Sequence, residues 1–111
     1  MEIVWSSLAV EQLADVLEYV EESFGTSVAR KTYQRITEKV AQLMNYPQIG
    51  VFDAGLSSLI EGVEVRHLIL APNVLYYLID NNEIVIMAVV HSKQSPEFIR
   101  KRVLSFLEQY Q

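Results

Sequence analysis

Cysteine is absent from the sequence, and histidine occurs only twice. Without cysteine, neither a disulfide framework nor a thiolate metal site can form. The two histidines, His67 and His91, lie 24 positions apart, which is not a spacing of metal ligands. We therefore expect no metal and no other cofactor, and the lack of disulfides suits a reducing cytoplasm.

Long apolar runs and a surplus of positive charge are also missing. The longest apolar run reaches about a third of the length that a membrane-spanning helix needs, and the first residues lack the basic start of a secretory signal. Nine Lys and Arg against 14 Asp and Glu give a net charge of −5, so the chain as a whole lacks the basic surface of a nucleic-acid-binding protein. We expect a cytoplasmic protein with no membrane partner, in which any contact with RNA or DNA would be local.

The sequence is rich in apolar residues, which make up 50% of its 111 positions. A chain of this length can bury one core but is too short for two. We therefore predict a single domain over residues 1–111.

The first half of the chain has the period of helices. A short apolar strand, Glu2 to Trp5, precedes Ser6-Ser7, whose hydroxyls can cap a helix. Apolar residues then recur three and four apart up to Gly25, which can end the helix in a left-handed conformation. Thr26-Ser27 can cap a second helix, which Pro47 stops. The apolar positions are Leu13, Val16, Leu17, Val20 and Phe24 in the first helix, and Ala29, Tyr33, Ile36, Val40, Leu43 and Met44 in the second.

The two predicted helices carry opposite charges on their outer sides. Exposed charge stripes usually indicate solvated faces with some ion pairing between helices, and a pattern that binds a partner is the alternative. The acidic stripe is Glu11, Asp15, Glu18 and Glu22, and the basic one is Lys31, Arg35 and Lys39.

The second half of the chain changes to the period of strands. Residues 48–62 hold three glycines and no clean period, which indicates a loop with at most a short irregular strand. Strands are then predicted over 63–71, 74–79 and 84–91, joined by turns so short that the strands must be antiparallel. The last strand is apolar on both faces, which favours a central position covered by helices on at least one side. Ser95-Pro96-Glu97 then opens a final helix.

The order of these elements, together with particular residues, resembles the RelE/ParE superfamily of toxins from type II toxin–antitoxin modules. The likeness covers nearly the whole chain. It implies the α+β fold of that superfamily, in which an N-terminal short strand and helical hairpin pack on an antiparallel β-meander followed by a C-terminal helix. It also implies a cognate antitoxin as partner. The sequence does not fix the oligomeric state, and a homodimer stays an open alternative. The residues that carry it are ADVLEYVEESFG, LMNYPQIG, Arg66, the YYLID strand and IVIMAVVHSKQSP.

The superfamily has two branches that act differently. RelE-like toxins cut mRNA in the ribosome and need basic side chains around the scissile phosphate, plus a proton donor and acceptor. ParE-like toxins poison DNA gyrase by binding. The nuclease branch usually has an arginine where this chain has Asn73, a turn rich in Arg and Lys where this chain has Lys93 alone, and a late catalytic tyrosine. Here the only late tyrosine is Tyr110, whose helical spacing predicts a core residue.

If the chain were a nuclease, its catalytic candidates would be Arg66, His91 and Lys93. Arg66 is common to both branches and is better explained as an ion pair or carbonyl clamp that holds the sheet to the preceding loop. His67 is expected to be a half-exposed strand residue. His91 has no carboxylate at a recognisable spacing, so we expect its ring to hydrogen-bond the backbone of residues 92–95, although an imidazole could still act as an acid or base.

Arg100-Lys101-Arg102 is the densest basic cluster in the chain. Three consecutive helical residues sweep about 200° and cannot form one track for a phosphate backbone. They can ring the exposed side of the last helix, where an acidic antitoxin segment or the gyrase target could bind, and they are the candidates for partner binding.

The sequence therefore predicts a ParE-like toxin that acts by binding DNA gyrase rather than by catalysis and that a cognate antitoxin neutralises. Two alternatives stay open. One is a RelE-like ribosome-dependent mRNA endoribonuclease, and the other is a non-toxic binding module on the same fold.

Overall fold

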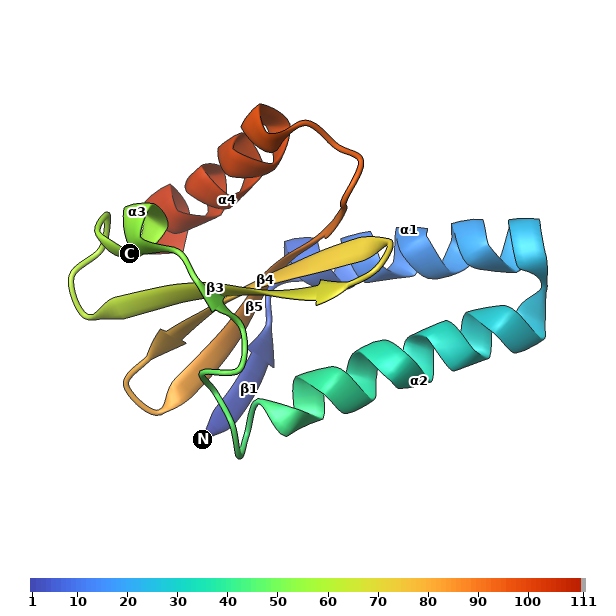
Figure 1. Cartoon of the computed structure of the whole chain (residues 1–111), viewed down its shortest axis with the longest axis horizontal. Helices are drawn as coiled ribbons and strands as arrows, with labels where there is room; N and C mark the ends of the chain where they lie inside the picture. Colours follow the sequence, from blue (N-terminus) through green and yellow to red (C-terminus); the bar gives the residue numbers. More distant parts are fainter. Residues whose placement is uncertain (111) are drawn as a thin grey trace.

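The computed structural model describes residues 1–110 (Figure 1). The chain forms a five-stranded sheet with helices on both faces. In order, its elements are β1 (Glu2–Trp5), α1 (Ser7–Phe24), α2 (Thr26–Gln42), β2 (Val51–Phe52), α3 (Ala54–Ser57), β3 (Val63–Leu70), β4 (Asn73–Asp80), β5 (Glu83–His91) and α4 (Pro96–Tyr110).

The predicted antiparallel meander is confirmed, and two short strands extend it. The strand order is β1-β5-β4-β3-β2, and β4 is antiparallel to both of its neighbours, β3 and β5. β1 runs parallel to β5, a pairing on which the sequence analysis made no prediction. Periodicity shows only that a segment is a strand, so it could not indicate this partner or its direction. With β1 on one side and β4 on the other, β5 is an interior strand, as its apolar sequence predicts.

The caps of the helical hairpin differ partly from those predicted. The Ser6 hydroxyl accepts a hydrogen bond from the Ala9 N–H at 3.0 Å, as expected of an N-cap. Gly25 has φ 97° and ψ 168°, so it is not the left-handed helical residue that we predicted, although side chains rarely tolerate this φ either. The prediction that Thr26-Ser27 caps the second helix is wrong. Gly25 alone links the two helices and is itself the N-cap of α2, with no side-chain hydrogen bond.

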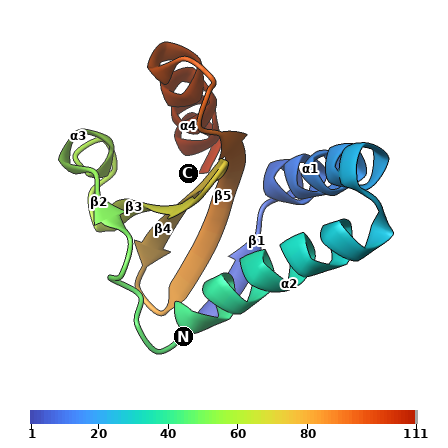
Figure 2. The same cartoon turned by 45° about the vertical axis from the view of Figure 1, so that its right-hand side comes forward.

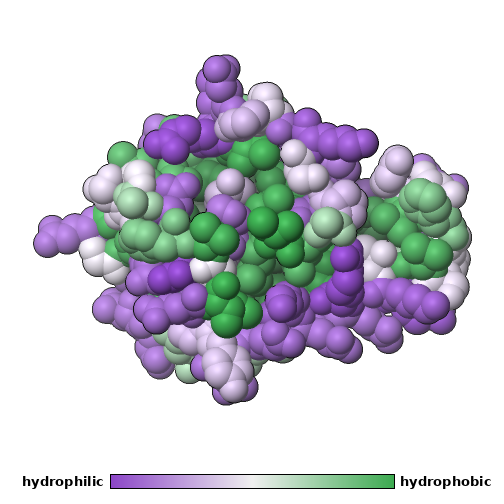
Figure 3. Space-filling view, viewed as in Figure 1, coloured by the Kyte–Doolittle hydropathy of each residue, from purple (hydrophilic) through white to green (hydrophobic). Residues whose placement is uncertain are grey.

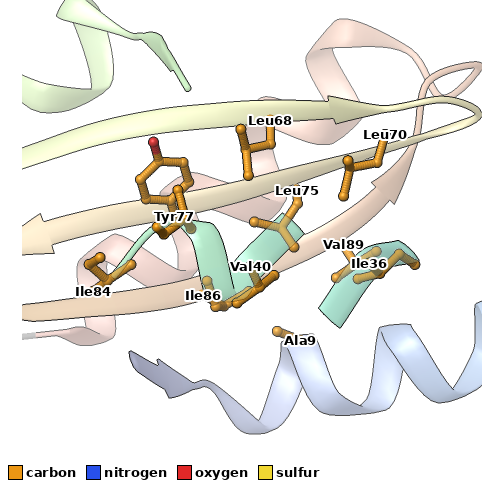
Figure 4. Packing of buried hydrophobic residues seen from close by; sticks show 11 residues of the cluster. Ala9, Ile36, Val40, Leu68, Leu70, Leu75, Tyr77, Ile84, Ile86 and Val89 are labelled. Carbon is orange, nitrogen blue, oxygen red and sulfur yellow. The ribbon is translucent and has the colours of Figure 1, made fainter. Parts of the chain in front are cut away.

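One core lies between the sheet and the hairpin. Figure 4 shows Ile36 and Val40 of α2 and Ala9 of α1 against side chains of β3, β4 and β5. Tyr77, from the middle of β4, is fully buried in this core. The alternation of β4 places Asn73, Leu75 and Tyr77 on this face and Val74, Tyr76 and Leu78 on the other.

A second core lies on the opposite face, under α3 and α4 (Figure 2). Val103 and Leu107 of α4 are buried there, and Leu56 of α3 joins them. The helix α3 is a correction to the prediction that residues 48–62 form a loop with at most a short strand. Asp53 caps it by accepting a hydrogen bond from the Leu56 N–H at 2.8 Å. A helix of four residues is too short for its period to be recognised in a sequence.

Candidate partner-binding groove

The helical hairpin is longer than the face of the sheet that it covers. Figure 1 shows α1 and α2 running past the end of the sheet, and Figure 2 shows the outer turns of both helices with no strand beneath them. Of the 18 residues of α1, only Ala9 is fully buried. The apolar stripe predicted for this helix therefore exceeds what the fold itself can bury.

This overhang forms a groove of about 490 Å³ between the hairpin and the end of the sheet, which we name the hairpin groove. Its walls come from α1 and α2, and its floor comes from the adjacent ends of β4 and β5. The lining residues are Gln12, Asp15, Val16, Tyr19, Val20, Phe24, Val28, Thr32, Arg35, Pro72, Asn73, Val89, Val90, His91, Gln94 and Arg102.

The walls of the hairpin groove expose large apolar side chains. Tyr19 is 63% exposed, Phe24 is 64% exposed and Val28 is 42% exposed. Figure 3 shows apolar residues gathered over the middle of the sheet and a second group at the far end of the hairpin. A clustered apolar surface rimmed by polar residues is typical of an interaction site.

Charged groups of both signs border the groove. Asp15 of α1 stands on one wall, and Arg35 of α2 on the other donates to the Ala71 carbonyl at 3.0 Å. That hydrogen bond ties α2 to the turn between β3 and β4. Arg102 of α4 lies at the border and stacks over the Phe98 ring, with its guanidinium carbon 5.1 Å from the ring centroid.

Side chains of the hairpin also close the edge of β5 beyond the end of β1. The Ser6 hydroxyl donates to the Met87 carbonyl at 2.9 Å, and the Gln12 Oε1 accepts the Val89 N–H at 2.7 Å. The Gln12 amide thus takes the place of a neighbouring strand at the floor of the groove. A partner segment that lies in the groove would meet a floor whose backbone is already hydrogen-bonded there.

His91 lies at the end of β5 and lines the groove. Its Nδ1 accepts the Lys93 N–H at 3.0 Å, and its backbone N–H donates to the Gln94 Oε1 at 3.1 Å. The hydrogen bond that we expected from its ring to the following turn is therefore present. Asn73, its partner in the register of β4 and β5, is 4% exposed and donates from Nδ2 to the Val90 carbonyl at 3.5 Å.

Arg66 is a clamp on the loop before β2. Its Nη1 donates to the Gly50 carbonyl at 2.7 Å and to the Gln48 carbonyl at 3.2 Å, and its Nε pairs with Glu64. The guanidinium also lies 5.4 Å from the centre of the Phe52 ring. Both roles considered for this residue, ion pair and carbonyl clamp, are present in the structure.

Tyr77 holds the same loop from within the core. Its hydroxyl accepts the Gly50 N–H at 3.0 Å and donates to the Pro47 carbonyl at 2.7 Å. Burial raises the pKa of Tyr77, and the hydrogen bond from Gly50 opposes that rise. A Cβ on Gly50 would lie only 2.5 Å from this hydroxyl, so glycine is needed for the approach.

The structure does not bring the three nuclease candidates together. In the strand register, Arg66 of β3 is opposite Tyr77 of β4, and His91 of β5 is opposite Asn73 of β4. Arg66 and His91 therefore lie on opposite sides of β4, and their positions are four residues apart along it, which is roughly 13 Å of strand. Lys93 is exposed in the turn after β5, next to His91 but far from the Arg66 clamp.

The basic residues of α4 point to different flanks, as the sweep of a helix predicts. Arg102 borders the hairpin groove, whereas Arg100 lines a separate pocket of about 380 Å³ between α3 and α4. Asp53 and Tyr76 line the same pocket. Burial and then Asp53 raise the pKa of Tyr76, while Arg100 lowers it. Lys101, between the two arginines, is exposed.

Sequence reasoning recognised the apolar spacing of the hairpin but did not identify it as a binding surface. Tyr19, Val28 and Gln12 were missed as site residues, although the length of the stripe was a signal. A helix whose apolar period continues for 18 residues is longer than one face of an average strand can cover. His67 is half-exposed as predicted, and its ring lies 5.4 Å from that of Tyr76.

Within residues 1–110, no group of three or more His, Asp or Glu side chains is placed to hold a metal ion. In the same range, none of the helices combines the length and the apolar character that crossing a membrane requires.

Comparisons with known proteins place this geometry in context. The sequence model of one family, described as the ParE toxin of the type II toxin–antitoxin system parDE, matches residues 3–96. A solved structure of the chromosomal ParDE toxin–antitoxin system from P. aeruginosa is similar in fold, with a TM-score of 0.63 and 23% sequence identity. The likeness covers 82% of this chain and 95% of that chain. No curated protein is significantly similar to the sequence.

Proposed function

We propose that this chain, which belongs to the family of ParE toxins of type II toxin–antitoxin systems, arrests growth by binding a protein target and is neutralised by an antitoxin segment in the hairpin groove. The observation that carries the proposal is the groove itself. Its walls expose Tyr19, Phe24 and Val28, which the chain leaves uncovered.

An amphipathic antitoxin segment fits this surface for two reasons. Such segments are disordered alone and order on binding, so they can follow a long groove between two helices and a sheet edge. The rim carries both signs of charge, with Asp15 on one wall and Arg35 and Arg102 across from it. A partner with apolar anchors at helical spacing and charges of both signs at its edges would satisfy the surface.

Binding is favoured over catalysis because the basic residue that a nuclease would need at the sheet already has other partners. Arg66 donates hydrogen bonds to the Gly50 and Gln48 carbonyls and pairs with Glu64. The position that a nuclease would fill with arginine holds the buried amide of Asn73. We propose DNA gyrase as the target, on the strength of the family, with Arg100, Lys101 and Arg102 of α4 as contact candidates.

The antitoxin proposal is tested with charge introduced at exposed groove positions. Tyr19→Glu and Phe24→Glu change side chains that are more than half exposed, so the fold should remain intact. We expect each to weaken binding of the product of the adjacent reading frame by about tenfold or more, as loss of an apolar anchor does. The matched control is Tyr46→Glu, at a residue that is 65% exposed and lies outside the groove.

In cells, the groove variants should arrest growth even when the antitoxin is co-expressed, whereas Tyr46→Glu should remain neutralised. Equal binding by all three variants would place the antitoxin elsewhere. The target is tested separately, with purified gyrase and plasmid DNA. Accumulation of cleaved DNA bound to gyrase supports the proposal. New mRNA ends in translating ribosomes would instead identify a nuclease, and the absence of any growth effect would identify a non-toxic binding module.

A further inference from the structure

The strand β1 forms one edge of the sheet and has an unused row of backbone groups. Its parallel ladder with β5 includes the bonds from the Glu2 N–H to the Asn82 carbonyl and from the Ser6 N–H to the Ile86 carbonyl, both 3.0 Å. Because alternate residues of a strand face opposite neighbours, the N–H and C=O groups of Ile3 and Trp5 point away from β5. No hydrogen bond from another part of residues 1–110 reaches these groups.

Apart from its short length and the charged Glu2 at its start, β1 has none of the usual protections of an edge strand. Its sequence, EIVW, has no lysine, no proline and no bulge, and Val4 at its centre is 38% exposed. Edges of this kind pair readily with a further strand unless something blocks them.

We propose that a second copy of this chain pairs with this edge, so that the two β1 strands run antiparallel about a two-fold axis at Val4. In this register, Ile3 of each copy opposes Trp5 of the other, and both pairs exchange N–H and C=O bonds. All the free groups of the edge are then satisfied. Val4 faces its own counterpart in a non-hydrogen-bonded pair, where Cα atoms lie about 4.5 Å apart.

The charges near the edge are complementary in the same register. Glu2 of one copy opposes Ser6 of the other, and Ser6 has extended backbone angles, φ −67° and ψ 155°, so the pairing can continue to it. Ser6 is the N-cap of α1, whose first turn contains no acidic residue. A notch of about 190 Å³ opens there, lined by Ser6, Ser7 and Leu8 and by Arg102 of α4.

Each Glu2 carboxylate therefore meets the positive end of a helix and an arginine of the other copy. The free amides at the start of a helix and a guanidinium both attract a carboxylate. The two-fold symmetry repeats this contact, so the dimer contains it twice. An extended segment of an unrelated protein could use the same backbone groups, but only a second copy brings a glutamate to each notch.

The interface is small, because only four residues of each chain form the ladder. We expect a dimer with a dissociation constant of about micromolar, in the range of transient assemblies. No residue of β1 lines the hairpin groove. Pairing of the β1 strands thus leaves two hairpin grooves in the dimer, and Arg102 borders both the groove and the notch of its copy.

The absence of cysteine allows a direct test by cross-linking. In the variant Val4→Cys, the only thiols of the dimer would face each other across the axis, at a separation that a disulfide can span. The control is Ile69→Cys on β3, where the side chain is 65% exposed and would form collisional disulfides more readily than position 4. Under mild oxidation of folded protein, we expect a covalent dimer from Val4→Cys and little from Ile69→Cys. The reverse result would overturn the proposal.

A charge exchange tests the notch. Glu2→Lys and Arg102→Glu should each raise the dissociation constant, measured by sedimentation equilibrium, by about tenfold. The double variant should restore it, because the opposite charges again face each other between copies. A wild-type protein that stays monomeric at the highest concentration reached, or a double variant as weak as the single ones, would refute the pairing. Circular dichroism of each variant shows whether the fold is retained.

Discussion

His91 allows a sharp test of whether this toxin binds or cuts. Its ring makes one hydrogen bond, in which Nδ1 accepts the Lys93 N–H at 3.0 Å. In the variant His91→Asn, the side-chain oxygen occupies nearly the position of Nδ1, so the acceptor remains while the titrating proton is lost. His91→Ala removes both. The pair of variants separates the role of the hydrogen bond from that of proton transfer.

The stability cost of His91→Ala follows from the surroundings of that bond. The Lys93 N–H lies in an exposed turn and can bond to water when the ring is gone. The cost is therefore the net value of one hydrogen bond, about 0.5–1.5 kcal/mol. Two backbone bonds of the turn stay in place: Ser92 N–H to the Pro72 carbonyl at 2.8 Å, and Gln94 N–H to the His91 carbonyl at 3.0 Å. His91→Asn should cost less still.

Urea unfolding measures these costs, and induced expression measures toxicity. If His91 has only the structural role, His91→Asn should arrest growth nearly as well as the wild type. His91→Ala should lose toxicity only as far as folded protein is lost. A general acid or base would instead contribute roughly 10²- to 10⁴-fold to a rate without affecting the fold. A folded but non-toxic His91→Asn, with mRNA cleavage ends that disappear relative to the wild type, would refute the reasoning.

Two further predictions concern tyrosine hydroxyls. Tyr77→Phe should lower the free energy of unfolding by about 2–4 kcal/mol, because the buried Gly50 N–H and the Pro47 carbonyl both lose their partner; a loss below about 0.5 kcal/mol in urea unfolding would contradict this. The Tyr110 hydroxyl donates to Asp80 at 2.8 Å, and burial followed by Asp80 raises the pKa of Tyr110 to about 12. The folded state thus holds this proton more tightly than the unfolded state, so the stabilisation is complete below about pH 10 and is lost as the pH rises towards 12. Tyr110→Phe should remove that alkaline loss, and an unchanged pH profile would show that the hydrogen bond contributes nothing.

Most of the fold could be predicted because its elements have a clear period. The long helices of the hairpin and the three strands of the meander repeat their apolar residues often enough to be recognised. The wrong predictions concern features that depend on local backbone geometry or on distant contacts. Gly25 links two helices in a single step, and Asp53 caps a helix of one turn. The parallel pairing of β1 depends on contacts between residues about 80 positions apart, as between Ile3 and Ile84, and no local pattern encodes them.

The site was less predictable than the fold, for a different reason. Arg66 could be assigned to a clamp or ion pair because a guanidinium has several donors in a fixed fork that suit carbonyls and carboxylates, and a loop lay just before its strand in the sequence. The hairpin groove could not be assigned in this way. Its formation depends on where the sheet ends beneath the helices, which is a property of the assembled molecule.

The apolar residues of α1 therefore serve two functions, and the sequence pattern is the same for both. Near the start of the helix, Ala9 is buried and contributes to the core. Towards its end, Phe24 continues the stripe and Tyr19 lies beside it, and each has more than half of its surface in water. Each of these side chains lacks part of the stabilisation that complete burial gives, which is about 1.5–3 kcal/mol for a large apolar side chain. The fold does not recover this free energy, so it remains available to a partner that covers the groove. The same periodicity thus predicts core where a strand lies beneath the helix and an interface where none does.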